Sequence, residues 1–227
     1  MATIEKLWLY AHCPFCMRVE VALGALGIKV EKEIVQYDDA ETPTKMIGKK
    51  MLPILEYTIN GEKKYMGESM DIVKFLDSQS TGKKLSPIEK AREEKILEWL
   101  FKDFSPKNGY LYWPRVANKV RLPEMTTDSG LAYWVNKHDS KSDIKFLAEN
   151  EQRTKDVLAS LNVFEEKILL SETAANGKDI GYEDVLIVPF LMHLTLVKGF
   201  PYPAKTKAYI DNMVKATGHA TLKQWES

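Results

Sequence analysis

The sequence predicts an α/β domain with the element order β-α-β-α-β-β-α, followed by an all-helical domain. Over residues 1–80 of the 227, strand-like and helical spacings of apolar residues alternate along the chain. Beyond residue 87 the spacing is helical and strand patterns disappear. A polar segment with Gly82 and Pro87 separates the two patterns. We therefore assign residues 1–80 to the first domain, 81–87 to a linker and 88–227 to the helical domain.

Each element of the first domain has a local signal. Apolar or β-branched runs indicate strands, and Asn60-Gly61 is a strong hairpin signal between the last two. Gly27 and Gly48 are expected just past the ends of helices, and Pro43 is expected at a first helical position. The expected strands are 3–10, 28–35, 53–59 and 62–67, and the expected helices are 14–27, 42–48 and 68–80.

In the second domain, helical spacing predicts helices over 88–104, 147–170 and 203–217. Residues 110–143 are expected to form helices and loops, because Pro114, Pro123 and Gly130 interrupt them.

One helix start in this domain has a sharp signal. Gly181 is the expected N-cap, with Asp184 placed to accept the N–H of the cap residue. Ile180 and Val185 have the spacing of a hydrophobic staple. The helix that follows is apolar on nearly all sides, so we expect it at the centre of the domain, with a bend at Pro189.

The composition excludes several functional classes. Lys plus Arg equals Asp plus Glu, 32 each, which gives no reason to expect a nucleic-acid partner. The N-terminus has charges inside its apolar part, unlike a signal peptide, and the most apolar later run, 185–197, is too short to cross a bilayer. We therefore expect a cytoplasmic protein with no membrane partner, in a compartment where structural disulfides are rare.

Both cysteines of the chain lie in one tetrapeptide, Cys-Pro-Phe-Cys, at residues 13–16. Pro14 suits the first position of a helix, which makes Cys13 the expected N-cap and puts Cys16 in the first turn. Residues at this spacing share a helix face, so the two sulfurs can meet. The positive end of the helix dipole favours the Cys13 thiolate, the species that attacks disulfides. We therefore predict that Cys13 is the nucleophile and Cys16 the resolving thiol.

Two other readings of this motif are weaker. A zinc site normally needs a second pair of ligands, but the chain has no further cysteine, and its later histidines show no ligand spacing. His12 adjoins the motif, but we expect it to point elsewhere from the end of a strand. We therefore expect no metal. A chance Cys-x-x-Cys would not also supply the preceding strand and the proline.

Two further segments are interpreted together with the cysteine motif. Leu52-Pro53 precedes the third strand, and a cis bond there would expose the Leu52 backbone beside the thiols. An ordinary trans proline at a strand start is the alternative. Glu68 and Ser69 open the third helix, whose N-terminus can bind an anion. Simple capping by Ser69 is the alternative there.

Together the segments CPFC, LPILEY and GESMDIVKFLD, followed by a helical domain, resemble the larger bacterial glutaredoxins that have glutathione-transferase architecture, the type-two glutaredoxins. DDAETPTKMIGKK and FLMHLTLVKGFPYPAK extend the resemblance toward both ends of the chain. The resemblance implies a thioredoxin-like domain packed on the helical domain. It also implies a monomer that uses glutathione as cosubstrate to reduce disulfide-containing or glutathionylated proteins.

The resemblance also assigns roles to residues. Cys13 would attack and Cys16 would be its partner, while Leu52 and cis Pro53 would hold the cysteinyl backbone of glutathione. Glu68 and Ser69 would receive its γ-glutamyl end. Glutathione would also lie against Cys13, Pro14 and Phe15. Phe15 stands where glutaredoxins usually have tyrosine, so a role for the hydroxyl is lost but the thiol chemistry is not.

Other functions on the same fold remain open at this point. A glutathione transferase or dehydroascorbate reductase usually relies on Tyr, Ser or a single cysteine, so the second cysteine argues against both. A non-enzymatic binding protein, related to the intracellular chloride-channel proteins, shares the fold and a similar cysteine motif. The short apolar run at 185–197 gives membrane insertion little support.

Overall fold

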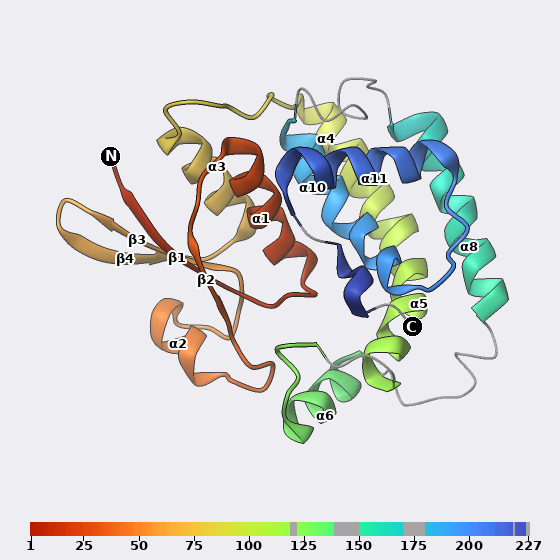
Figure 1. Ribbon diagram of the computed structural model, residues 1–227, viewed down its shortest axis with the longest axis horizontal. Helices are drawn as coiled ribbons and strands as arrows, with labels where there is room; N and C mark the ends of the chain where they lie inside the picture. The colour runs from red at the N-terminus through yellow and green to blue at the C-terminus, as the bar shows by residue number, and fades with distance from the viewer. Residues whose placement is uncertain (119–121, 139–149, 170–179, 220, 226–227) are drawn as a thin grey trace.

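The computed structural model describes residues 1–118, 122–138, 150–169, 180–219 and 221–225. A four-stranded sheet and three helices come first, and helices follow from residue 90 onward (Figure 1). The predicted order β-α-β-α-β-β-α is confirmed. Its elements are β1 (Thr3–Leu9), α1 (Pro14–Leu26), β2 (Glu31–Ile34), α2 (Glu41–Ile47), β3 (Ile54–Ile59), β4 (Glu62–Met66) and α3 (Ser69–Gln79).

The sheet is mixed, with the strand order β2-β1-β3-β4. β1 runs parallel to β2 and antiparallel to β3, and β3 pairs with β4 in an antiparallel hairpin. Asn60 and Gly61 join that hairpin with φ values of 54° and 78°, the positive pair that a tight primed turn requires. Leu7 of β1 lies opposite Leu55 of β3, and both are fully buried in the core.

Helix α1 lies between the sheet and the helical domain (Figure 1). It ends at Gly27, whose φ of 71° lets the chain turn out of the helix, while the N–H of Ile28 donates to the Leu23 carbonyl at 2.9 Å. Nine of its 13 residues are buried. The helix packs against α3 on one side and against α10 and α11 on the other.

Several elements differ in extent from the prediction, among them β2, α2 and α3. β2 covers only Glu31–Ile34, because the chain before it completes the end of α1. α2 begins at Glu41, so Pro43 is its third residue rather than its first. The earlier start is stabilised by the Asp39 carboxylate, which accepts the Thr42 N–H at 2.9 Å. α3 begins at Ser69, and Glu68 is the cap residue outside it.

The helical domain contains α-helices and several tighter or wider helical turns. Its elements are α4 (Lys90–Glu98), η1 (Trp99–Phe104), α5 (Ser105–Asn118), α6 (Asp128–Lys137), α8 (Asn150–Val163), η2 (Phe164–Ile168), α10 (Tyr182–Met192), η3 (His193–Leu196), α11 (Ala204–Thr217) and η4 (Leu222–Trp225). Pro114 and Gly130 lie inside α5 and α6, so neither ends a helix as expected. Part of the predicted 110–143 and 147–170 segments lies outside the described residues.

Helix α10 forms the centre of this domain, as its all-apolar pattern predicts. All its residues from Asp184 to Met192 are buried. The predicted cap is confirmed: the Gly181 N–H donates to Asp184 Oδ2 at 2.8 Å, and the Tyr209 hydroxyl donates to Oδ1 at 2.6 Å. Burial nevertheless raises the pKa of Asp184 to about 6.

The segment between α3 and α4 is tied to the start of α10. The Ser86 N–H donates to the Ile180 carbonyl, and the Ser86 carbonyl accepts the Tyr182 N–H, both at 3.1 Å. The division at residues 81–87 stays a prediction. Within the described ranges, every helix is too short or too polar to cross a bilayer.

The close approach of α1 to the end of α11 yields a test of this packing. A methyl group on Gly24 would meet the backbone carbonyl of Thr217 far inside van der Waals contact. Helix propensity alone would favour alanine by about 1 kcal/mol. We expect the clash to win, so that Gly24→Ala lowers the free energy of unfolding by about 2 kcal/mol in urea melts. Gly82→Ala, which meets nothing within 4 Å, is the control and should change little.

Candidate active site

Cys13 lies at the N-terminus of α1, just after β1. It is the N-cap residue, as predicted, with an extended backbone (φ −73°, ψ 121°) and Pro14 in the first turn after it. Its N–H donates to the Tyr10 carbonyl at 3.3 Å, and its carbonyl accepts the Met17 N–H at 2.9 Å. Hydrogen bonds thus fix the backbone of Cys13 through both its N–H and its carbonyl group.

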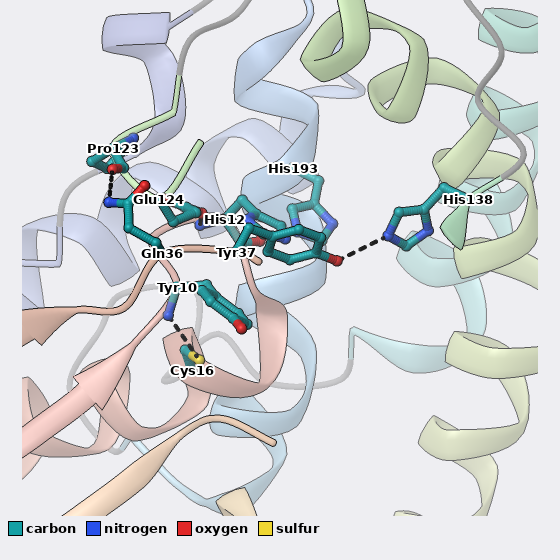
Figure 2. A network of polar contacts seen from close by, with 9 residues as sticks. All are labelled: Tyr10, His12, Cys16, Gln36, Tyr37, Pro123, Glu124, His138 and His193. Carbon is teal, nitrogen blue, oxygen red and sulfur yellow. Dashed lines mark hydrogen bonds and ion pairs between the residues drawn. The ribbon is translucent and has the colours of Figure 1, made fainter. Parts of the chain in front are cut away.

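The two cysteines differ in exposure. Cys13 is half-buried, whereas Cys16 is fully buried, and neither is in a disulfide. The Cys16 sulfur accepts the backbone N–H of Tyr10 at 3.4 Å (Figure 2). A reagent or substrate can thus reach Cys13 from the surface, while Cys16 is reached through Cys13.

The surroundings separate the pKa values of the two thiols. A hydrogen bond from Cys16 lowers the pKa of Cys13 to about 6, against the opposing effect of burial. The charge of His12 and the backbone N–H groups of Cys16 and Phe15 act in the same direction. Burial raises the pKa of Cys16, and the neighbouring Cys13 adds to the shift. At neutral pH the arrangement favours a thiolate at Cys13 and a thiol at Cys16.

A cavity of about 410 Å³ lies over Cys13, between the two domains. From the first domain, four of the residues predicted to bind glutathione line it: Cys13, Pro14, Phe15 and Leu52. The helical domain supplies most of an aromatic wall, with the rings of Phe101, Tyr112, Trp113, Tyr133 and Phe190. The site is therefore a largely apolar space with a reactive sulfur at one side.

The Leu52-Pro53 peptide bond is cis, as predicted for a residue beside the thiols. Leu52 is buried and lines the same cavity as Cys13, at the start of β3. The structure thus places the Leu52-Pro53 segment beside Cys13, in the same cavity.

The third element, Glu68-Ser69, lies at the N-terminus of α3 and outside the lining of that cavity. Glu68 has a positive φ of 62°, a strained conformation for a residue with a side chain. Its carboxylate pairs with Lys49 Nζ at 2.9 Å. Ser69 is the first helical residue and is buried, so it is not the N-cap that the simple capping alternative requires.

The ring of Phe15 projects from the first turn of α1 toward the helical domain. It is 39% exposed and meets Phe190 edge to face, with ring centres 5.9 Å apart. The guanidinium of the buried Arg18 lies 4.9 Å from the Phe15 ring and 5.3 Å from the Phe190 ring. Phe15 thus acts as a packing ring at the mouth of the site, and a hydroxyl is not needed for these contacts.

Sequence reasoning set His12 aside, but the structure places it in the wall of the cavity beside Cys13. Its Nδ1 contacts the carboxylate of Glu124, a fully buried residue of the helical domain, and Figure 2 shows the two residues side by side. The His12 carbonyl accepts Nε2–H of His193 at 2.8 Å. The adjacency of His12 to the motif was a usable signal. Glu124 carries no local signal, because it lies 112 residues away in the chain.

Metal binding has no support among the residues that the structure describes. They contain no group of three or more His, Cys, Asp or Glu side chains arranged to hold a metal ion.

Two family models match the chain. Residues 7–84 match the N-terminal domain of glutathione S-transferases, and residues 95–225 match the C-terminal domain of glutaredoxin 2. The glutathione transferase GSTFuA2 from Phanerochaete chrysosporium superposes with a TM-score of 0.69 at 16% identity, over 95% of this chain and 98% of that one. At that identity the likeness shows the fold alone.

Two more similar relatives are both bacterial. Glutaredoxin 2 of Escherichia coli K12 is 36% identical over 217 residues, covering 93% of this chain and 95% of the relative. The structure of glutaredoxin 2 from Salmonella typhimurium in complex with glutathione has a TM-score of 0.83 at 32% identity, covering 98% of each chain. At this identity and coverage, and with the match to the glutaredoxin 2 C-terminal domain, this chain belongs to the glutaredoxin 2 family.

Proposed function

We propose that Cys13 and Cys16 reduce glutathione mixed disulfides and protein disulfides at the expense of glutathione. The chain's membership of the glutaredoxin 2 family supports glutathione-dependent oxidoreductase activity. The observation that carries the residue assignment is the pair of unlike thiols, with an accessible Cys13 of lowered pKa above a fully buried Cys16.

For a protein–glutathione mixed disulfide, one thiol suffices. The Cys13 thiolate attacks the glutathione sulfur, the old S–S bond breaks, and the protein sulfur leaves as a thiolate that takes up a proton. Cys13 is then bonded to glutathione. The thiolate of a second glutathione attacks the sulfur of the bound glutathione. Glutathione disulfide is released, and the Cys13 thiolate is restored.

For a disulfide within a protein, both thiols take part. Cys13 attacks one sulfur and forms a mixed disulfide with the substrate. Cys16 loses its proton and attacks the Cys13 sulfur, so that the substrate leaves with two thiols and a Cys13–Cys16 disulfide forms. Two glutathione molecules then reduce this disulfide and leave as glutathione disulfide.

We place glutathione across the N-termini of α1 and α3. The Leu52 backbone, held by cis Pro53, would pair with its cysteinyl unit beside Cys13. Glu68 and Ser69 would receive the γ-glutamyl end, where the free N–H groups of α3 favour a carboxylate. Pro14 and Phe15 would contact the ligand from the first turn of α1. The glutathione complex of the Salmonella relative supports a ligand of this type.

The partners we propose are glutathione and proteins that carry disulfides or glutathionylated cysteines. A reducing cytoplasm suits a catalyst whose two cysteines are both free. We propose a monomer, because the site is built from the two domains of one chain.

Replacing each cysteine separates the two proposed roles. Turnover of a glutathione mixed disulfide is measured with glutathione, glutathione reductase and NADPH. Cys13→Ser should abolish it, because no attacking thiolate remains, whereas Cys16→Ser should retain it. With a protein disulfide as substrate, Cys16→Ser should lose most activity as well. Equal losses for both variants on both substrates would contradict the assignment.

The pH dependence of Cys13 reactivity follows from its lowered pKa. Because the thiolate is the reactive form, alkylation of the reduced protein by iodoacetamide should rise through a midpoint near pH 6 and level off above neutral pH. A thiol with the ordinary pKa of about 8.5 would still be gaining reactivity there. A midpoint in that ordinary range would contradict a stabilised thiolate.

The proposed glutathione carboxylate contact is tested at Ser69. Removing its hydroxyl removes a hydrogen bond to a charged group, so Ser69→Ala should raise the KM for glutathione about tenfold and leave kcat largely unchanged. Ser78→Ala is the matched control on the same helix, because the exposed Ser78 hydroxyl donates to the Phe75 carbonyl and accepts from the Gln79 side chain, within α3 itself. Equal KM values for the two variants would place the carboxylate elsewhere.

A further inference from the structure

We propose that Glu124 is a positioning residue for the thiol chemistry: it holds His12 as an imidazolium beside Cys13, so that the helical domain helps to activate the attacking thiol. The inference rests on the proposed role of Cys13. It gives the helical domain a role in activating the attacking thiol, in addition to its role in shaping the cavity.

The Glu124 carboxylate is built into the protein interior. Its side chain has no exposure, and Oε1 accepts the backbone N–H of His12 at 3.0 Å as well as contacting Nδ1 of the ring. Within the described residues, Oε2 has no hydrogen-bond partner. Burial alone would raise the pKa of Glu124, but the charge of His12 and its hydrogen bonds hold the pKa below the usual range. A fully buried carboxylate is stabilised by a paired cation, and we assign that role to His12.

The His12 ring has little freedom to leave Glu124. It is packed edge-on to Trp134, with ring centres 4.7 Å apart, and edge-on to Tyr37 at 5.4 Å. On its backbone side, the His12 carbonyl accepts a hydrogen bond from His193. A carbonyl oxygen can only accept, so Nε2 of His193 carries the proton, and burial lowers the pKa of His193 to about 3. His193 is therefore a neutral donor that fixes the backbone next to Cys13.

Glu124 is itself held against the first domain by uncharged contacts. The Tyr37 N–H donates to the Glu124 carbonyl at 2.8 Å. Next to it, Gln36 Nε2 donates to the Pro123 carbonyl at 3.1 Å, and the Thr126 hydroxyl donates to Gln36 Oε1 at 2.7 Å. Figure 2 shows the Gln36 side chain bonded to Pro123, while the Tyr37 hydroxyl is directed at His138. The position of the carboxylate thus depends on the docking of the two domains.

The other titratable groups around the site leave a distinct role for His12. Burial raises the pKa values of three facing tyrosines and keeps them neutral: Tyr10, Tyr37 and Tyr112. Burial lowers the pKa of His138 to about 4, so it is neutral as well.

Three cations also lie near the site. Arg18 stays charged at neutral pH, although burial lowers its pKa to about 10. Lys50 Nζ donates to the Tyr37 carbonyl at 2.8 Å and lies 3.5 Å from the Tyr133 ring centre. Lys137 Nζ lies 5.5 Å from the Tyr37 ring centre. Substituting Glu124 leaves all three charges in place, so a change in Cys13 reactivity after that substitution reports on the His12–Glu124 pair.

Glu124→Gln tests the proposal because it keeps the shape of the side chain and removes its charge. The readout is the pH midpoint of iodoacetamide alkylation of the reduced protein between about pH 4 and pH 9. Fragment mass spectrometry locates the label on Cys13. We expect the midpoint to rise by about one pH unit. His12→Gln should give the same rise, and the double variant should add nothing further.

Glu56→Gln is the matched control. It makes the same change at another buried carboxylate, which pairs with Lys63 and lies outside the lining of the cavity, so its midpoint should equal that of the wild type. An unchanged midpoint in folded Glu124→Gln would overturn this inference alone. A wild-type midpoint near the ordinary value of about 8.5 would overturn the role of Cys13 and this inference with it.

A measurement on the wild-type protein covers the case in which Glu124→Gln does not fold. The imidazole ¹⁵N shifts of labelled protein at neutral pH distinguish a ring protonated on both nitrogens from a neutral ring. We expect His12 to be doubly protonated and His138 and His193 to be neutral. A neutral His12 would refute the proposal without any substitution.

Discussion

The anchoring of α1 on both sides is the constraint on which the site depends. Its buried residues pack against α3 on one side and against α10 and α11 on the other. Only its N-terminus reaches the cavity, with Cys13 as the cap. Because the helix cannot shift, the sulfur, the free N–H groups of the first turn and Cys16 keep one geometry. A thiolate is stabilised by donors that are already in place and need no reorganisation when it forms.

The two domains contribute different groups to the cavity over Cys13. The first domain carries the thiols and the cis Leu52-Pro53 bond. The helical domain lines the other side with aromatic rings, and burial there keeps the Tyr112 hydroxyl neutral. In such an apolar space the few charges present act more strongly than they would in water. The small number of polar groups near Cys13 is therefore part of what tunes it.

Two buried carboxylates show how the neighbouring group determines whether the pKa of a buried carboxyl is raised or lowered. Asp184 accepts bonds from the Gly181 N–H and the Tyr209 hydroxyl, yet burial still raises its pKa to about 6. Glu124 is also buried, but the charge and hydrogen bonds of His12 hold its pKa below the usual range. Neutral donors support the helix cap at Asp184, whereas the contact between Glu124 and His12 joins the two domains. The same residue class thus serves folding in one place and the reactive site in the other.

Local sequence by itself determined the cysteine pair at a helix N-terminus, the Asn60-Gly61 hairpin and the Gly181 cap, because each depends on residues within a few positions of one another. Element ends were less predictable: α2 begins at Glu41, where the Asp39 carboxylate accepts the Thr42 N–H, so Pro43 lies inside the helix. Only the tertiary structure decided what faces Cys13. Glu124 reaches His12 across 112 residues, and no local pattern records a contact that exists only when two domains dock.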